Sequence, residues 1–290
     1  IDRHELEKST LNLDIAVCQS ADLFIKELLN GLSGFDNDYS AWINQCQDLE
    51  SNFSIVSEDY QHNTKINPYL FIHQFSEYLQ ENDIIVYDGG SIMNYVMQAF
   101  RLKRGQRLVC STGLELPGFA IPGAIGVSQW SQDKPIYCLC EGQGAQLSLA
   151  ELQTIATYQL PIKIMNFRSK GNATIRKIQK DFFGSRYVGT DNEILFGHSA
   201  IEEITRVYGI PVVEIKNPDK IAENLQDFIS QKGPMMCEIH VDSDQELIPR
   251  MGFTIKDDGK WLAKPLEDMY PFLDRDVLKN AMCIALWEED

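Results

Sequence analysis

The sequence predicts an α/β fold with a doubly wound parallel sheet, because strand-like and helix-like segments alternate along most of the chain. In residues 136–179, the apolar run IYCLC precedes two glycines, a segment with apolar residues at helical spacing, and a second apolar run, IKIMNF. The order of strand, glycine turn and helix recurs in residues 83–100, and strands and helices alternate again between residues 200 and 242. Ligands of such sheets bind at the carboxyl ends of the strands, here the EGQG turn and the FRSKGN loop.

The first part of the chain reads as the tail of another α/β domain. A strand is predicted over residues 13–18 (LDIAVC), and a short helix over residues 41–49. Between them, a helix is predicted whose apolar face carries Ala21, Phe24, Ile25, Leu28 and Leu29. Residues 51–65 are polar and resemble a surface linker. We therefore divide the chain into residues 1–64 and a larger domain of residues 65–290.

The second strand–turn–helix segment predicts an anion site. Asn67 and Pro68 start the helix before it, since proline fits the first helical turn. The strand IIVYD then leads into Gly89 and Gly90, and Ser91 is expected to cap the next helix. Free backbone N–H groups and the helix dipole converge at such a turn and attract anions. The simpler interpretation is an ordinary connection between a strand and a helix.

Composition excludes several kinds of partner. The net charge of −16 argues against nucleic acid or an anionic membrane surface as the main partner. The seven cysteines show no zinc-binding spacing, and Cys138 and Cys140 share one face of a predicted strand, which indicates reduced and mostly buried thiols. We find no signal peptide and no apolar run of membrane-spanning length, and expect a cytoplasmic protein.

Residues 136–179 resemble the thiamine-diphosphate-dependent acetolactate synthase superfamily, and the likeness is greatest to members found in polysaccharide biosynthesis. The segments QLSLAELQTIATYQLPIKI and IRKIQ match this family without a gap. Its signature is Gly-Asp-Gly after one strand and Asn-Asn after the next. In the family, the Asp, the second Asn and a nearby backbone carbonyl hold a Mg²⁺ ion, which binds the cofactor's diphosphate.

The resemblance implies a cofactor site at the ends of the two strands. Glu141-Gly142-Gln143 occupies the Gly-Asp-Gly positions, and Arg168-Ser169 the Asn-Asn positions. The cofactor contacts implied here are Gly142, Gln143, Gly144, Ala145, Arg168, Ser169 and Gly171. Metal contacts would come from Ser169 and Gly171, whereas Glu141 would supply a carboxylate if the alignment slipped by one residue. Arg168 and Lys170 are two cations that could instead neutralise a diphosphate without a metal.

Two further segments complete the resemblance. Residues 118–126 (GFAIPGAIG) match the family's GFGLPAAIGA, which follows an apolar residue that props the cofactor rings. That residue falls on Pro117, next to Leu116. The family's turn Asp-x-Gly-Ser, which touches the diphosphate, corresponds here to the turn that ends with Gly90 and Ser91.

Several other segments carry candidate functional residues. A dinucleotide fingerprint would need a third glycine after Gly142 and Gly144, and none follows. Residues 180–198 lack periodicity and resemble the family's mobile active-site loop. Their candidate catalytic residues, which a polar surface loop would carry anyway, are Asp181, Arg186 and His198. His73 is interpreted as a partly exposed helix residue, residues 249–271 as a C-terminal docking segment, and residues 274–287 as a final helix.

The resemblance implies decarboxylation or carboligation of a 2-oxo acid with thiamine diphosphate and Mg²⁺, in a protein that forms homo-oligomers. The family's glutamate that activates the cofactor lies on a preceding domain, so we expect this chain to be a C-terminal portion that is inactive alone. The alternative is a non-catalytic member that keeps the fold for assembly and binds no cofactor. The changes at the metal and ring positions favour that alternative.

Overall fold

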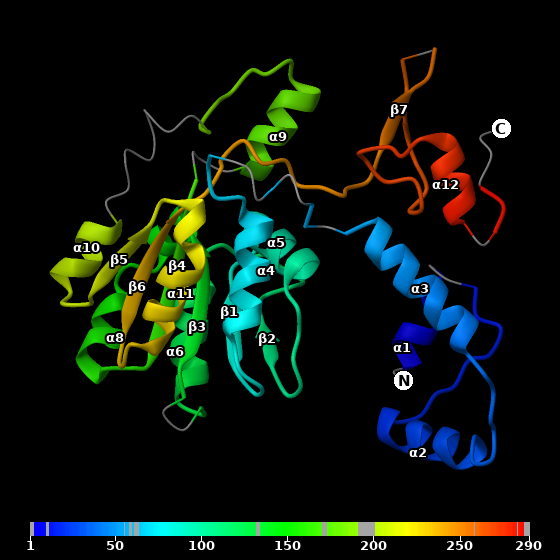
Figure 1. Cartoon of the computed structure of the whole chain (residues 1–290), viewed down its shortest axis with the longest axis horizontal. Helices are drawn as coiled ribbons and strands as arrows, with labels where there is room; N and C mark the ends of the chain where they lie inside the picture. Colours follow the sequence, from blue (N-terminus) through cyan, green and yellow to red (C-terminus); the bar gives the residue numbers. More distant parts are fainter. Residues whose placement is uncertain are drawn as a thin grey trace. The chain divides into compact units, whose positions relative to one another are not determined.

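The computed structural model describes residues 3–9, 12–54, 56–57, 60, 64–131, 134–169, 173–190, 201–257, 259–282 and 284–286. The chain divides after Phe53 into two compact units (Figure 1). In the first unit the structure describes the helices α1 (Arg3–Leu6), α2 (Ala21–Gly31) and α3 (Ser40–Asn52). The two domain ranges expected from the sequence stay a prediction.

The strand predicted over residues 13–18 is wrong, whereas the helix after it is confirmed. The described residues of the first unit contain no strand with which residues 13–18 could pair. A strand at residues 13–18 would therefore leave its backbone hydrogen bonds unmade. The apolar face of α2 is open to solvent in this chain: Ile25 is 52% and Leu29 is 64% exposed. The predicted linker is also partly wrong, because Val56 and Tyr60 pack against the core of the second unit.

The second unit is built on a six-stranded parallel sheet with the order β2-β1-β3-β4-β6-β5. Its strands are β1 (Ile84–Tyr87), β2 (Arg107–Val109), β3 (Ile136–Glu141), β4 (Ile162–Arg168), β5 (Val212–Ile215) and β6 (Met235–His240). Strands β1, β3 and β4 are buried along almost their whole length, which explains why they read as continuous apolar runs.

Helices cover both faces of this sheet, which confirms the doubly wound class (Figure 1). One face packs against α4 (Pro68–Tyr78), α5 (Ser91–Ala99) and α11 (Ile221–Ser230). The other packs against α6 (Ala120–Ser128), α7 (Gly142–Leu147), α8 (Glu151–Tyr158) and α10 (Ile201–Val207). The predicted start of α4 is confirmed, since the side chain of Asn67 accepts hydrogen bonds from the amides of Tyr69 and Leu70.

Two predicted turns differ from the structure. Residues 142–147 form helix α7 directly at the end of β3, so the glycines there lie in a helix and not in an open turn. At the end of β1, Gly90 is the N-cap of α5, with φ of 79°, and Ser91 is the first helical residue. Glycine adopts that left-handed φ at little cost, which leaves the serine hydroxyl available for a contact across the sheet.

The remaining elements follow α8 and close the second unit. They are α9 (Ala173–Phe182), a 3₁₀ turn (Pro218–Lys220), the antiparallel hairpin of β7 (Phe253–Ile255) and β8 (Trp261–Ala263), and α12 (Arg275–Ala281). The predicted loop 180–198 begins inside α9, because residues 180–182 are helical, and its residues 191–198 lie outside the described part. The final helix ends at Ala281, which is earlier than predicted. No described helix has the length and apolar character that crossing a bilayer requires.

Candidate functional site

The candidate site lies where the order of the strands reverses. From β1 the chain continues through α5 to β2 on one side, and then returns across β1 to β3 on its other side. The carboxyl ends of β1 and β3 therefore form a topological switch point, the place where sheets of this kind bind ligands. Ser91 follows the end of β1, Glu141 ends β3, and Ser169 follows the end of β4.

Glu141 joins these three strand ends. Ser91 Oγ donates a hydrogen bond to Glu141 Oε2 at 2.6 Å, and Ser169 Oγ donates one to Glu141 Oε1 at 2.5 Å. Each oxygen of the Glu141 carboxyl group thus accepts one hydrogen bond from a serine hydroxyl. Burial raises the pKa of Glu141, although both serine hydrogen bonds act in the opposite direction. We call Ser91, Glu141 and Ser169 the serine–glutamate cluster.

Asp88 forms a second centre just behind this cluster. Its Oδ1 accepts a hydrogen bond from the amide of Ala120 at 2.7 Å, which ties the start of α6 to the end of β1. Burial raises the pKa of Asp88 to about 6, against the lowering effect of nearby backbone amides. A Cβ atom on Gly144 would lie 2.1 Å from Asp88 Oδ2, so α7 approaches Asp88 as closely as only glycine allows.

The loop with the predicted ring-contacting residues lies beside the turn after β1. A Cβ atom on Gly89 would lie 2.3 Å from the backbone carbonyl of Glu115, so the loop approaches that turn closely at Glu115. Both Leu116 and Pro117 are exposed on this loop. Leu116 and Pro117, which follow Glu115, therefore lie at the same end of the sheet as Gly90 and Ser91. That these residues contact a cofactor stays a prediction.

The predicted cofactor-binding residues after β3 and those at the end of β4 have different surroundings. Gly142, Gly144 and the buried Ala145 lie in α7 beside Asp88, as does the backbone of Gln143. Arg168 is instead engaged with α10, since its Nη1 lies 3.2 Å from Glu202 Oε1. Lys170 and Gly171 lie outside the described residues.

Among the other candidates, Asp181 is tied to its neighbours. It forms ion pairs with Lys177 at 2.6 Å and with Arg250 at 3.5 Å, which indicates a structural role. Arg186 is exposed, His73 is partly exposed as predicted, and His198 lies outside the described residues. Within the described part of the chain, no group of three histidine, cysteine or acidic side chains could hold a metal ion.

The sequence analysis did not identify a polar row next to this site, which is buried at Cys140, Asn166 and Glu238 and exposed at Glu214. Cys140, Asn166, Glu238 and Glu214 are register partners across β3, β4, β6 and β5. Asn166 Nδ2 donates a hydrogen bond to Glu238 Oε2 at 2.7 Å, and both side chains are almost fully buried. The signal was available in the polar residues inside the apolar runs IKIMNF and MMCEIH.

Comparison with known proteins decides the family. Residues 88–239, more than half of the chain, match the family model "Thiamine pyrophosphate enzyme, C-terminal TPP binding domain". The chain belongs to this thiamine pyrophosphate enzyme family. The match begins at Asp88 and ends just before His240, so it contains the serine–glutamate cluster and the strands β3 and β4.

Relatives of this thiamine pyrophosphate enzyme domain include several acetolactate synthase large subunits. The chain is 26% identical over 249 residues to that of Lactococcus lactis, covering 86% of this chain and 42% of the relative. It is 26% identical over 262 residues to a probable acetolactate synthase large subunit of Methanococcus aeolicus, covering 85% and 43%. An isozyme 1 large subunit of Escherichia coli is 23% identical over 189 residues, covering 63% and 32%. The chain thus spans less than half the length of these relatives.

Proposed function

We propose that this chain is the C-terminal portion of an acetolactate synthase-like protein that no longer holds thiamine diphosphate through Mg²⁺ and keeps the fold for assembly. The serine–glutamate cluster carries this proposal. The position that the resemblance assigns to the metal-binding aspartate is Gly142, and the carboxyl group of the preceding residue, Glu141, has both oxygens hydrogen-bonded to protein hydroxyls.

The described residues do not fit a magnesium site of the kind that the family resemblance implies. Mg²⁺ requires near-octahedral oxygen ligands and usually at least one carboxylate. Both oxygens of Glu141 already accept hydrogen bonds from serine hydroxyls, so a metal bound through this carboxyl group would have to displace at least one of them. A metal at Ser169 would therefore have to compete with the hydrogen bond between Ser169 and Glu141.

The hypothesis that Arg168 and Lys170 bind the diphosphate in place of Mg²⁺ has less support than the loss of cofactor binding. Arg168 already forms an ion pair with Glu202, on the helix α10. A diphosphate at the switch point would have to draw the guanidinium away from that carboxylate, which is only 14% exposed. Leaving a buried carboxylate without its partner is costly.

The second candidate function is a working enzyme that uses thiamine diphosphate on 2-oxo acids. It is favoured by the geometry at the switch point, where a glycine turn and the N-terminus of α5 follow the end of β1. The names of the relatives also support it. In this case the cofactor would supply the electron sink for loss of CO₂, and this chain would supply backbone amides and hydroxyls for its diphosphate.

Calorimetric titration with thiamine diphosphate separates the two candidates. We expect the full chain to give no binding heat, with Mg²⁺ or with EDTA. The matched variant carries Glu141→Gly, Gly142→Asp and Ser169→Asn, which restore three of the five signature residues of the family, including both metal-binding side chains, and we expect it to bind only when Mg²⁺ is present. Binding by the unaltered chain that requires Mg²⁺ would refute the proposal and support the enzyme. Binding in EDTA that is lost in Arg168→Ala would support cation replacement instead.

A further inference from the structure

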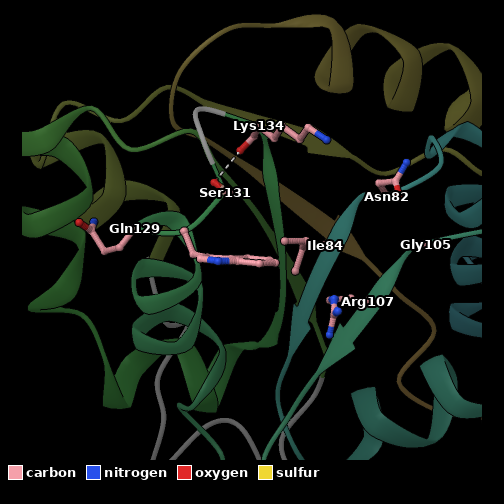
Figure 2. Close-up of a pocket in the computed structure, with 8 residues that line it drawn as sticks. Asn82, Ile84, Gly105, Arg107, Gln129, Ser131 and Lys134 are labelled. Atoms are coloured by element: carbon pink, nitrogen blue, oxygen red, sulfur yellow. Dashed lines mark hydrogen bonds between the residues drawn. The ribbon is translucent and has the colours of Figure 1, made fainter. Parts of the chain in front are cut away.

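A cavity of about 680 Å³ lies at the opposite edge of the sheet from the serine–glutamate cluster, at the amino ends of β1 and β2 (Figure 2). It is lined by Asn82, Ile84, Gly105, Arg107, Gln129, Trp130, Ser131 and Lys134. Cavities that hold small molecules have volumes of about 300 to 1,000 Å³. Nothing in the switch-point site uses these residues.

An exposed tryptophan provides the apolar wall of this cavity. Trp130 follows α6 and is 70% exposed, whereas its neighbour in the lining, Ile84, is 7% exposed. Arg107 Cζ lies 6.0 Å from the centre of the Trp130 ring, within the range of a cation–π contact. An indole that stands open beside an aliphatic side chain and a guanidinium offers a stacking surface for a flat aromatic ring.

The charge of the lining is opposite to that of the chain. The chain has 42 acidic and 26 basic residues, yet the lining contains Arg107 and Lys134 and no acid. Within the described part of the chain, neither cation forms an ion pair or a side-chain hydrogen bond. Asp83, between the lining residues Asn82 and Ile84 in the sequence, is buried, accepts a hydrogen bond from the amide of Gln80 at 2.7 Å, and interacts electrostatically with Lys134. Asp133, which precedes Lys134 in the sequence, lies outside the described residues. Two cations in this setting favour an anionic ligand.

The walls of the cavity are held in place by backbone geometry. Asn82 and Gly105 both have positive φ, of 67° and 75°, and a Cβ atom on Gly105 would lie 2.1 Å from Asn82 Oδ1. On the other wall, Ser131 Oγ donates to the carbonyls of Ser128 at 3.2 Å and Lys134 at 3.3 Å, which fixes the turn that carries Trp130. Figure 2 shows the Ser131–Lys134 contact, and shows the amide of Gln129 directed away from Ile84 and Arg107. The cavity is therefore largely preformed.

We propose that this cavity binds a small planar aromatic anion, whose ring stacks on Trp130 while its phosphate or carboxylate group lies between Arg107 and Lys134. Arginine binds either anionic group bidentately, and lysine adds a mobile point charge. Asn82 supplies a hydrogen-bonding amide at the rim. Nucleoside monophosphates and aromatic carboxylates share this chemistry.

The test is calorimetric titration of the full chain with AMP and, separately, with indole-3-acetate. We expect at least one of the two compounds to bind. If AMP binds, adenosine and inorganic phosphate, which each supply half of AMP, should bind at least tenfold more weakly than AMP. Binding by AMP alone assigns a nucleotide, and binding by indole-3-acetate alone assigns a carboxylate. Binding of neither compound overturns the proposal.

Variants locate the binding. Trp130→Ala should weaken binding at least tenfold, while Trp130→Phe, which keeps a stacking ring, should stay within about threefold of the unaltered chain. Arg107→Ala and Lys134→Ala should each weaken binding of the anion without changing the weak binding of adenosine. The matched controls are Trp261→Phe and Lys256→Ala, which lie in or next to the β7–β8 hairpin. Equal binding by Trp130→Ala and the unaltered chain would refute the site.

The site is independent of the proposed function, and the two can be separated. Thiamine diphosphate also carries rings and an anionic group, so any binding that it shows should be measured again in Trp130→Ala. Loss of that binding in the variant assigns it to this cavity. Retention together with a requirement for Mg²⁺ assigns it to the switch point.

Discussion

At the scale of single residues, Glu238 links the stability of the protein to pH. This side chain lies in the middle of β6, is 1% exposed, and accepts one hydrogen bond, from Asn166. Burial raises its pKa to about 7, from an ordinary value of 4.5. The folded protein therefore binds a proton at this site between about pH 4.5 and 7, whereas the unfolded chain has released it. The contribution of Glu238 to the free energy of unfolding falls as the pH rises through that window.

Glu238→Gln should remove this loss, because the amide stays neutral and can still accept the hydrogen bond from Asn166. Relative to the unaltered protein, we expect the variant to gain about 1 to 3 kcal/mol of stability between pH 4.5 and pH 8, since one pKa unit corresponds to about 1.4 kcal/mol. Urea unfolding of both proteins across this range measures the difference.

Glu214→Gln is the matched control, since Glu214 is the register partner of Glu238 on β5 and has the opposite environment. Its pKa is lowered, chiefly by Lys216 at 2.6 Å, so its charge contributes stability above about pH 4.5 that is lost at lower pH. This variant should therefore gain nothing as the pH rises. A difference between Glu238→Gln and the unaltered protein that does not change with pH would show that Glu238 is charged in the folded state throughout.

At the scale of elements, the position of α7 depends on one glycine. Gly144→Ala would place a methyl group 2.1 Å from Asp88 Oδ2 and 3.1 Å from the amide nitrogen of Gly118. Asp88 cannot yield freely, because it is buried and bonded to the amide of Ala120. We expect a loss of about 1 to 3 kcal/mol in the free energy of unfolding, as is usual when a tightly packed site is overfilled. Urea unfolding at fixed pH measures it.

Gly126→Ala provides the comparison within a neighbouring helix. Gly126 lies in α6, and a Cβ atom there would meet nothing within 4 Å. The same substitution should therefore stabilise the protein by up to about 1 kcal/mol, because alanine loses less conformational entropy than glycine in a helix. Equal effects of the two substitutions would mean that α7 is not held against Asp88.

At the scale of the whole molecule, we predict that a protein of the relatives' full length is a dimer or tetramer. The family resemblance implies active sites built between two chains, and this chain spans only 42% of the Lactococcus relative. The chain alone should associate weakly, because it carries only part of that surface. Light scattering of both proteins gives their masses, and a strictly monomeric mass for the longer one would contradict the prediction.

Much of the fold was already determined by the sequence. The strands β1, β3 and β4 are buried on both faces, so they appear as apolar runs, and α4 and α8 appear as apolar residues at helical spacing. These patterns are local, because each follows from the burial of one segment. The same local segments carry the resemblance that identified the family, since they preserve the framework between Gln146 and Gln179.

The tertiary structure alone decided what the candidate site contains. Ser91 and Ser169 lie 50 and 28 residues from Glu141 in the chain, and only the order and register of β1, β3 and β4 bring their hydroxyls to its carboxyl group. The edge strand β2 has three residues, which are too few for the alternation of apolar and polar residues that would identify a strand in the sequence. Lys163 is a charged residue inside an apolar run and is 2% exposed, because Phe228 of α11 packs over its ammonium group. Such partners are set by contacts between distant segments, which no local pattern records.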